Sequence, residues 1–173
     1  IAITNGIPYA NSQTVMLKID AFDSASGVSK MQISNDGSNW PDPEPFTPVK
    51  QWTLSDGDGP KTVNVKLMDN AGNWSAAFNY SLTLDTTNPS LNVTSPSSGL
   101  TGNNSPTVAF SSDTGDLMVT VDGNVIQVNS GDQIKGLSDG AHTIRIQATD
   151  SAGNQSVYET SFIVDTKPPF LNT

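Results

Sequence analysis

The chain has 173 residues, 35% of them hydrophobic, and its 17 acidic and 8 basic residues give a formal net charge of -9. Such a charge repels phosphate backbones and anionic lipids, so nucleic acid and membrane surfaces are poor partners. The absence of cysteine and the single histidine exclude disulfides, thiolate metal sites, a cysteine nucleophile and multi-histidine metal clusters. No apolar stretch approaches the roughly 18 residues that span a bilayer, and the first residues do not form a signal peptide, so we expect an excised or processed piece.

Apolar residues alternate with polar ones along the chain, which is the pattern of half-buried strands and not of helices. The alternating runs lie at 17–21, 63–67 and 78–84, and again at 108–110, 117–121, 144–148 and 162–164. Asp-Gly dipeptides between the runs favour tight turns, at 36–37, 56–57, 122–123 and 139–140. We interpret 56–57 and 139–140 as plain turns, because "SDGDG" lacks the spaced ligands and distal Glu of a calcium loop. Many short strands with regular turns predict a β-sandwich.

An internal repeat divides these elements into two copies. "KTVNVKLMDNAGNWS" aligns with "HTIRIQATDSAGNQS", and further on "YSLTLDTTNPSLN" aligns with "SFIVDTKPPFLN". The repeat period of about 80 residues exceeds that of a solenoid and suits two complete small domains in tandem. We therefore predict domains at 1–88 and 89–173, joined by the short segment "DTTNP", whose proline restricts its own backbone and that of Asn88.

The run "LSDGAHTIRIQATDSAGNQS", followed by "FIVDTKPP", resembles the bacterial immunoglobulin-like repeats found in tandem on large secreted and surface proteins. The resemblance covers about 89–169, and the weaker echo "SDGDGPKTVNVKLMDNAGNWS" extends it to the first copy up to about Asp85. It implies an all-β chain of two tandem immunoglobulin-like β-sandwich domains, secreted or on a bacterial cell surface, with neighbouring modules of the same chain as partners. Such modules serve as stalk spacers, adhesin segments or accessory domains of carbohydrate-active enzymes.

The repeated Asp-x-Ala-Gly-Asn motif predicts a tight turn. The Asp side chain can accept backbone N–H groups two residues on, the Gly can take a positive φ, and the Asn tolerates the left-handed region. A turn framework with exposed carboxylates is one interpretation, and calcium ligation is the alternative.

Calcium is the cofactor that these oxygen-rich turns would suit, because Ca²⁺ takes six to eight flexible oxygen ligands. Our hypothesis places a calcium site where the two modules join. The repeated turn of the first module and the chain exit of the second module are then half-sites, each to be completed by a further module. The candidate ligands of the central site are Asp85, Asp113, Asp116, Asp150 and Asn154, and those of the incomplete half-sites are Asp69, Asn73 and Asp165.

Catalysis is not expected from this sequence. His142 aligns with Lys61, at a position that we expect to face solvent, so it has no role as a base beside a hydroxyl nucleophile. The acidic residues lie in loops around strands and do not line a deep cleft of the kind that glycoside hydrolysis requires. We therefore predict that the chain is not an enzyme.

All three tryptophans lie in the first copy, and exposed indole faces can stack on sugar rings. Trp52 is expected in the core, whereas Trp40 and Trp74 are the candidates for ligand binding. The second copy has Gln155 at the position of Trp74, so the turn does not require an aromatic residue. The main prediction is a spacer or adhesive stalk, and the alternative is a carbohydrate- or other ligand-binding accessory module of a secreted enzyme.

Overall fold

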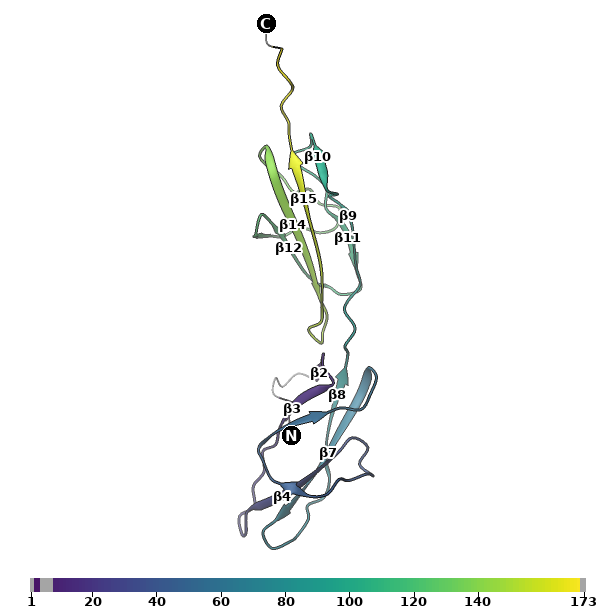
Figure 1. Cartoon of the computed structure of the whole chain (residues 1–173), viewed down its shortest axis with the longest axis vertical. Coiled ribbons are helices and arrows are strands. Elements are labelled where there is room, and N and C mark those ends of the chain that lie inside the picture. Colours follow the sequence, from purple (N-terminus) through teal and green to yellow (C-terminus); the bar gives the residue numbers. More distant parts are fainter. Residues whose placement is uncertain (1, 4–7, 172–173) are drawn as a thin grey trace. The chain divides into compact units, whose positions relative to one another are not determined.

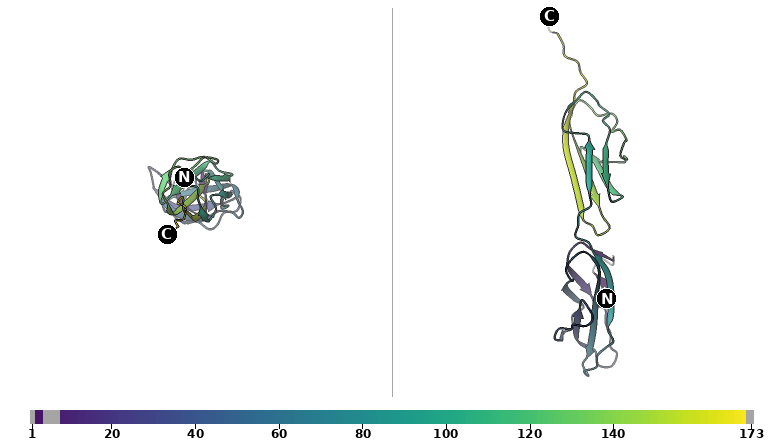
Figure 2. Two further views of the ribbon diagram at one scale, coloured as in Figure 1. Left: turned by 90° about the horizontal axis from the view of Figure 1, so that it is seen from above. Right: turned by 90° about the vertical axis from the view of Figure 1, so that its right-hand side faces the viewer.

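The computed structural model describes residues 2–3 and 8–171, and the chain divides into two compact units, Ile1–Thr87 and Asn88–Thr173. Every regular element of the described residues is a β-strand (Figure 1). Each unit has two sheets, and the two layers of the second unit are visible in Figure 2. The predicted all-β sandwich architecture is confirmed. No described segment forms a helix of the length and hydropathy needed to cross a membrane.

The first unit pairs a three-stranded sheet with a five-stranded sheet. The smaller sheet has the order β1 (Ala2–Ile3), β3 (Thr14–Lys18), β6 (Val49–Thr53). The larger sheet has the order β2 (Tyr9–Ala10), β8 (Phe78–Leu84), β7 (Gly59–Asp69), β4 (Val28–Ser34), β5 (Glu44–Pro45). Only β2 and β8 pair in parallel among these neighbours of the described chain, and all other pairs are antiparallel.

The second unit repeats this strand order. Its five-stranded sheet has the order β10 (Gly99–Thr101), β15 (Gln155–Val164), β14 (Gly140–Thr149), β12 (Asp116–Val121), β13 (Asn124–Ile126), again with the first pair parallel. The opposite sheet consists of β9 (Leu91–Ser95) and β11 (Ala109–Ser112). The internal repeat of the sequence is therefore also a repeat of topology.

Each unit has its own core between its two sheets, built from the alternate residues that the period-two pattern selects. In the first unit Leu17 and Val63 are fully buried, and in the second Ile144 and Ile146 are. Burying one such side chain contributes about 1.5–3 kcal/mol, so apolar burial is the main stabilising term in a chain without disulfides. The apolar run at 17–21 lies only partly in β3, which ends at Lys18.

His142 does not face solvent, and that expectation was wrong. Its side chain has the same strand parity as Ile144, so it points inward and is 7% exposed. The ring lies 5.9 Å from the ring of Phe162, centroid to centroid. Its Nδ1 lies 2.7 Å from Asp122 Oδ2, and its Nε2 lies 2.8 Å from the Ser138 carbonyl oxygen. A histidine can occupy this inward position because both polar nitrogens have partners.

Candidate functional site

The repeated Asp-x-Ala-Gly-Asn turn has nearly the same geometry in both units. In the first, Asp69 Oδ1 accepts the backbone N–H of Asn73 at 2.8 Å, and Asp69 Oδ2 accepts from Asn73 Nδ2 at 2.9 Å. Gly72, between them, has a φ of 91°, a conformation that favours glycine. The Asn73 side chain, followed by its backbone N–H, lowers the pKa of Asp69. The carboxylate therefore stays ionised and closes its own turn.

The second turn adds burial to the same bonds. Asp150 Oδ1 accepts the backbone N–H groups of Ala152 at 2.8 Å and Asn154 at 2.9 Å, and Oδ2 accepts from Asn154 Nδ2 at 2.9 Å. Burial opposes ionisation of Asp150, but the bonds from Asn154 and Ala152 outweigh it and lower its pKa. Gly153 has a φ of 90°, as the turn requires. The tight turn predicted from the sequence is confirmed at both positions, but neither Asn73 nor Asn154 takes the left-handed conformation.

A second pair of aspartates fixes the chain where it leaves each unit, and sequence reasoning missed this role. Asp58 Oδ1 accepts from the backbone N and Oγ1 of Thr86, at 3.0 and 2.9 Å. Asp58 Oδ2 accepts from Thr87 Oγ1 at 3.0 Å. These bonds, led by that of the Thr86 side chain, lower the pKa of Asp58. We name this set of contacts the exit clamp.

The second unit has the equivalent exit clamp at Asp139, which is therefore more than a plain turn residue. Asp139 Oδ1 accepts from the backbone N and Oγ1 of Thr166, at 2.9 and 2.8 Å, and Lys167 Nζ lies 3.2 Å from Asp139 Oδ2. The backbone bond from Thr166 is the main cause of the lowered pKa of Asp139. The signal was present in the sequence, because "DG" before the long strand and "DT" after the last strand recur together in both copies.

The chain is also fixed where it enters the second unit. Pro89 is buried, and its carbonyl oxygen accepts a 2.6 Å bond from Ser156 Oγ. The backbone N of Ser90 donates to Asp113 Oδ1 at 2.9 Å, and the Ser90 carbonyl accepts from Ser112 Oγ at 2.8 Å. Three side chains from the unit thus hold two consecutive residues of the segment that precedes β9.

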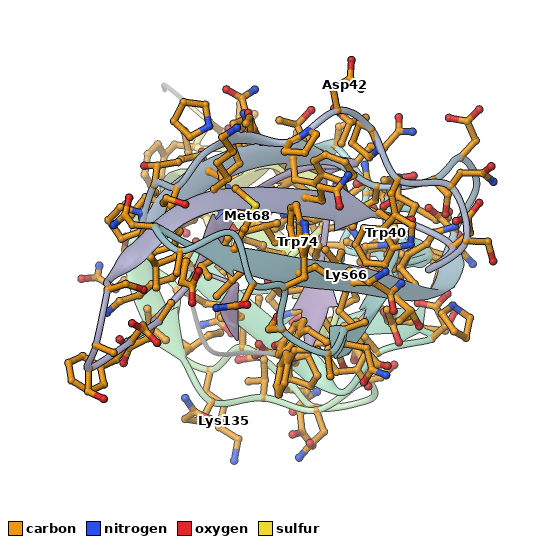
Figure 3. The ribbon with its side chains drawn as sticks, turned by 90° about the horizontal axis from the view of Figure 1, so that it is seen from below. Trp40, Asp42, Lys66, Met68, Trp74 and Lys135 are labelled. Carbon is orange, nitrogen blue, oxygen red and sulfur yellow. The ribbon has the colours of Figure 1, made fainter. Side chains whose placement is uncertain are left out.

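Trp40 and Trp52 line a surface pocket of about 520 Å³ in the first unit, together with Asn35, Asp36 and other residues. Trp52 Nε1 donates to Asn35 Oδ1 at 2.7 Å, which orients this indole ring. Lys66 Nζ lies 4.1 Å from the centroid of the Trp40 ring. Figure 3 shows both side chains on the same side of the first unit. Trp52 was expected in the core. It does pack against the core, but it is only partly buried and also lines the pocket.

Trp74 belongs to a different pocket. This pocket has a volume of about 270 Å³, and Phe22 and Ser75 are among its other lining residues. The Trp74 side chain is 41% exposed, and Figure 3 shows it near Met68, whose backbone forms an isolated β-bridge with it. The two tryptophans proposed as ligand contacts therefore do not share one cavity.

Comparison with known proteins identifies the second unit. Residues 92–166 match the family described as bacterial Ig-like domain. The second unit is a bacterial Ig-like domain. The family resemblance predicted from "DSAGNQS" and its flanking strands is thus confirmed, and the first unit has the same sheet order and turn as this bacterial Ig-like domain. Among curated proteins none matches the sequence.

The chain is also similar to solved structures. Fibronectin(III)-like modules of Clostridium thermocellum CbhA align with a TM-score of 0.58 and 16% identity over 99% of this chain and 98% of theirs. A C-terminal fragment of intimin has a TM-score of 0.48 and 10% identity, over 87% of this chain and 59% of the fragment. A Ca²⁺-stabilised adhesin of an Antarctic bacterium has a TM-score of 0.41 and 19% identity, over 96% and 48%. The likeness to the CbhA modules, at 16% identity, is one of fold.

Apart from Asp116, the candidate ligands of the bacterial Ig-like domain are engaged in hydrogen bonds within the domain itself. Asp113 binds the entering chain, Asp150 and Asn154 close the turn, and Asp116 begins β12. At the chain exits, Asp85 Oδ1 and Asp165 Oδ1 each accept the N–H group two residues on, at 3.1 Å. Within 2–3 and 8–171, no three His, Cys, Asp or Glu side chains form a group that could hold a metal ion. Calcium binding stays a prediction.

Proposed function

We propose that the chain is a pair of non-catalytic bacterial Ig-like modules that act as a spacer or adhesive stalk in an extracellular protein. Domains of this family are typically structural modules, and the family supports a secreted or cell-surface location. The exit clamp, formed by Asp58 in one unit and Asp139 in the other, is the observation that carries the proposal. A spacer has to hold its chain ends in a defined geometry, and the clamp does this at equivalent places in both units.

The second unit also suits a spacer element, because its entry and exit lie at opposite ends of its last strand. In the second unit Ser156 binds the entering chain near the start of β15, and the exit follows Val164. At roughly 3.3 Å per residue, this part of the strand separates the two ends by about 26 Å. Every repeat of this kind therefore adds length, and a fixed exit makes that length reproducible.

The pair of His142 and Asp122 in the second unit does not suggest catalysis. His142 is buried with Asp122 and Phe162, and its Nε2 is bonded to a backbone carbonyl. A general base has to reach its substrate and share a proton with it, and this ring is committed to structural partners on both nitrogens. We infer that the pair stabilises the fold.

The clamp can be tested by limited proteolysis of the full chain with a protease of broad specificity. Cleavage should be slow and confined to 85–89, giving two folded halves, and Asp58→Ala should accelerate it severalfold because Thr86 and Thr87 lose their acceptor. Asp42→Ala is the control, since Asp42 is exposed and lies in another loop. Equal cleavage rates in both variants and the natural chain would contradict a role of the clamp in ordering the linker.

Carbohydrate binding by an accessory module is the second candidate function, and the pocket between Trp40 and Trp52 favours it. Two partly exposed indoles with amide and carboxylate neighbours can combine stacking on a sugar ring with hydrogen bonds to its hydroxyls. Tryptophan fluorescence should then change on titration with one member of a panel of polysaccharides, and Trp40→Ala should abolish the change. No response to any member of the panel would remove this candidate.

A further inference from the structure

We propose that a groove in the first unit is a docking site for the proline-containing linker of another repeat, a segment of the type Asn-Pro-Ser. We name it the entry groove and define it by its lining residues Phe22, Asp23, Val28, Leu67, Met68, Asp69, Asn73, Trp74 and Ser75. The inference rests on the proposed function as a tandem module and names the partner of one surface.

The second unit shows how such a segment is held. Pro89 is buried beside the repeated turn, its carbonyl accepts from Ser156 Oγ at 2.6 Å, and the N–H of Ser90 donates to Asp113. The segment then continues into β9, where Leu91 lies opposite Ser112 of β11. A buried proline and one hydroxyl bond thus hold the entering segment next to the turn.

The first unit has the corresponding hydroxyl. Ser75 occupies the place of Ser156, directly after the Asn and one further residue of the repeated turn. Its strand partner is equivalent too. The backbone N of Ser75 donates to the Leu67 carbonyl at 2.8 Å, Ser156 pairs with Ala148, and Leu67 aligns with Ala148 in the repeat. Ser75 Oγ accepts the backbone N–H of Leu67 at 3.0 Å and donates to the Ala76 carbonyl at 2.8 Å. Rotation of the hydroxyl hydrogen about the Cβ–Oγ bond would redirect the donor to an incoming carbonyl and keep the bond from Leu67.

The entry groove offers exposed apolar surface. Phe22 is 88% exposed and Trp74 is 41% exposed, and both line the same pocket of about 270 Å³. This volume is below the roughly 300–1,000 Å³ of pockets that enclose drug-sized ligands, and it suits one or two residues of a peptide. A proline is well matched, because its apolar ring can pack on indole and its fixed φ lowers the entropy cost of docking.

The polar atoms of the groove match an extended backbone. The hydrogen bonds that Asp23 accepts from the loop 25–27 all go to its Oδ1, and within the described residues no donor reaches Oδ2. This oxygen can accept a backbone N–H, as Asp113 accepts that of Ser90. The loop bonds, led by that of Ser26, lower the pKa of Asp23 and keep it ionised.

Strand direction brings a linker to this place. β1 is antiparallel to β3, with Ala2 opposite Lys18 and Ile3 opposite Leu17, so its N-terminal direction points toward the loop that holds Phe22 and Asp23. β9 has the same relation to β11 in the second unit, where Pro89 precedes it. A segment that continued β1 in this direction would therefore reach the entry groove.

The test uses the natural chain and an extended chain in which Asp-Thr-Thr-Asn-Pro-Ser precedes Ile1, as residues 85–90 precede Leu91. The three indole N–H groups give three NMR signals, assigned with single Trp→Phe variants. We expect the Trp74 signal to shift in the extended chain and its exchange with water to slow about tenfold, with Trp40 and Trp52 unchanged. An extension with Gly in place of Pro, and Ser75→Ala in the extended chain, should each reverse most of the effect.

An unchanged Trp74 signal in the extended chain would overturn the proposal, and so would an equal effect of the Gly-containing extension. A Trp74 signal that moves with concentration in the natural chain would assign the groove to a second copy of the protein and would also overturn it. The clamp at Asp58 is tested by cleavage at 85–89, so failure of one proposal does not entail failure of the other.

Discussion

Raising the pH above neutrality should destabilise the second unit, because the partners of both ring nitrogens of His142 favour the protonated ring. Nε2 faces the Ser138 carbonyl, which can only accept, and Nδ1 faces the Asp122 carboxylate. The bond to Ser138, and then that to Asp122, raise the pKa of His142 above 6.5. A raised pKa in the folded state means that this stabilisation is complete below about pH 6.5 and is lost as the pH rises through the folded pKa.

The size of the destabilisation follows from the hydrogen bond to Asp122, which the neutral His142 ring cannot donate while Nε2 carries its proton. A hydrogen bond to a charged group contributes about 1.5–3 kcal/mol, and the 44% exposure of the Asp122 side chain places this one near 1.5 kcal/mol. In a domain of the size of Asn88–Thr173, 1 kcal/mol shifts Tm by about 4–8 °C. The Tm of the second unit should therefore fall by roughly 6–12 °C between pH 6 and pH 9.

Asp122→Asn tests the origin of this pH dependence. Asp122 has a φ of 50°, which asparagine tolerates, so the substitution adds little backbone strain. The amide oxygen can accept from the Thr143 N–H, as Asp122 Oδ1 does at 2.8 Å, while the amide NH₂ donates to neutral Nδ1. Neutral His142 then keeps both bonds, and the variant should have a nearly constant Tm above pH 6.

Differential scanning calorimetry of the full chain between pH 6 and pH 9 measures this, and the first unit is an internal reference because the only histidine lies in the second. A second-unit Tm that does not fall with pH would show that His142 is neutral in the folded state. An equal fall in Asp122→Asn would assign the pH dependence to another group.

Ile146→Ala should lower the stability of the second unit by about 2–5 kcal/mol, because it leaves a cavity at a fully buried position, and urea denaturation should show the first-unit transition unchanged. On the acid side, the lowered pKa of Asp150 means that its contribution to stability is complete above about pH 3.8 and is lost as the pH falls through the folded pKa. Asp150→Asn should therefore reduce the fall of the second-unit Tm between pH 5 and pH 2, with the remainder due to Asp122 and Asp139, whose pKa values are also lowered, and an unaltered slope would contradict this. Calcium binding by the acidic side chains predicts heat in a calorimetric titration that Asp150→Ala reduces, and the absence of binding would leave the repeated motif as a turn.

The sequence was sufficient for the features that depend on local interactions. Alternation of polar and apolar residues predicted the strands, since successive side chains of a strand point to opposite faces. The Asp-x-Ala-Gly-Asn turn closes on itself, as the bonds between Asp69 and Asn73 show, so five residues contain all of its determinants. The repeat of these local patterns was enough to predict two β-sandwiches, and the resemblance to bacterial immunoglobulin-like repeats supplied their type.

Tertiary structure decided the features that join distant parts of the chain. Parity along β14 could have placed His142 inside, but only the fold brings Asp122 to its Nδ1. The exit clamp joins residues 58 and 86, and the bond from Ser156 to Pro89 spans 67 residues. Such contacts depend on how strands are arranged in the sheets, and the turn chemistry of one segment carries no information about its partner. The role of Asp58 and Asp139, and the way in which Ser156 holds Pro89, therefore emerge only when the sheets are assembled.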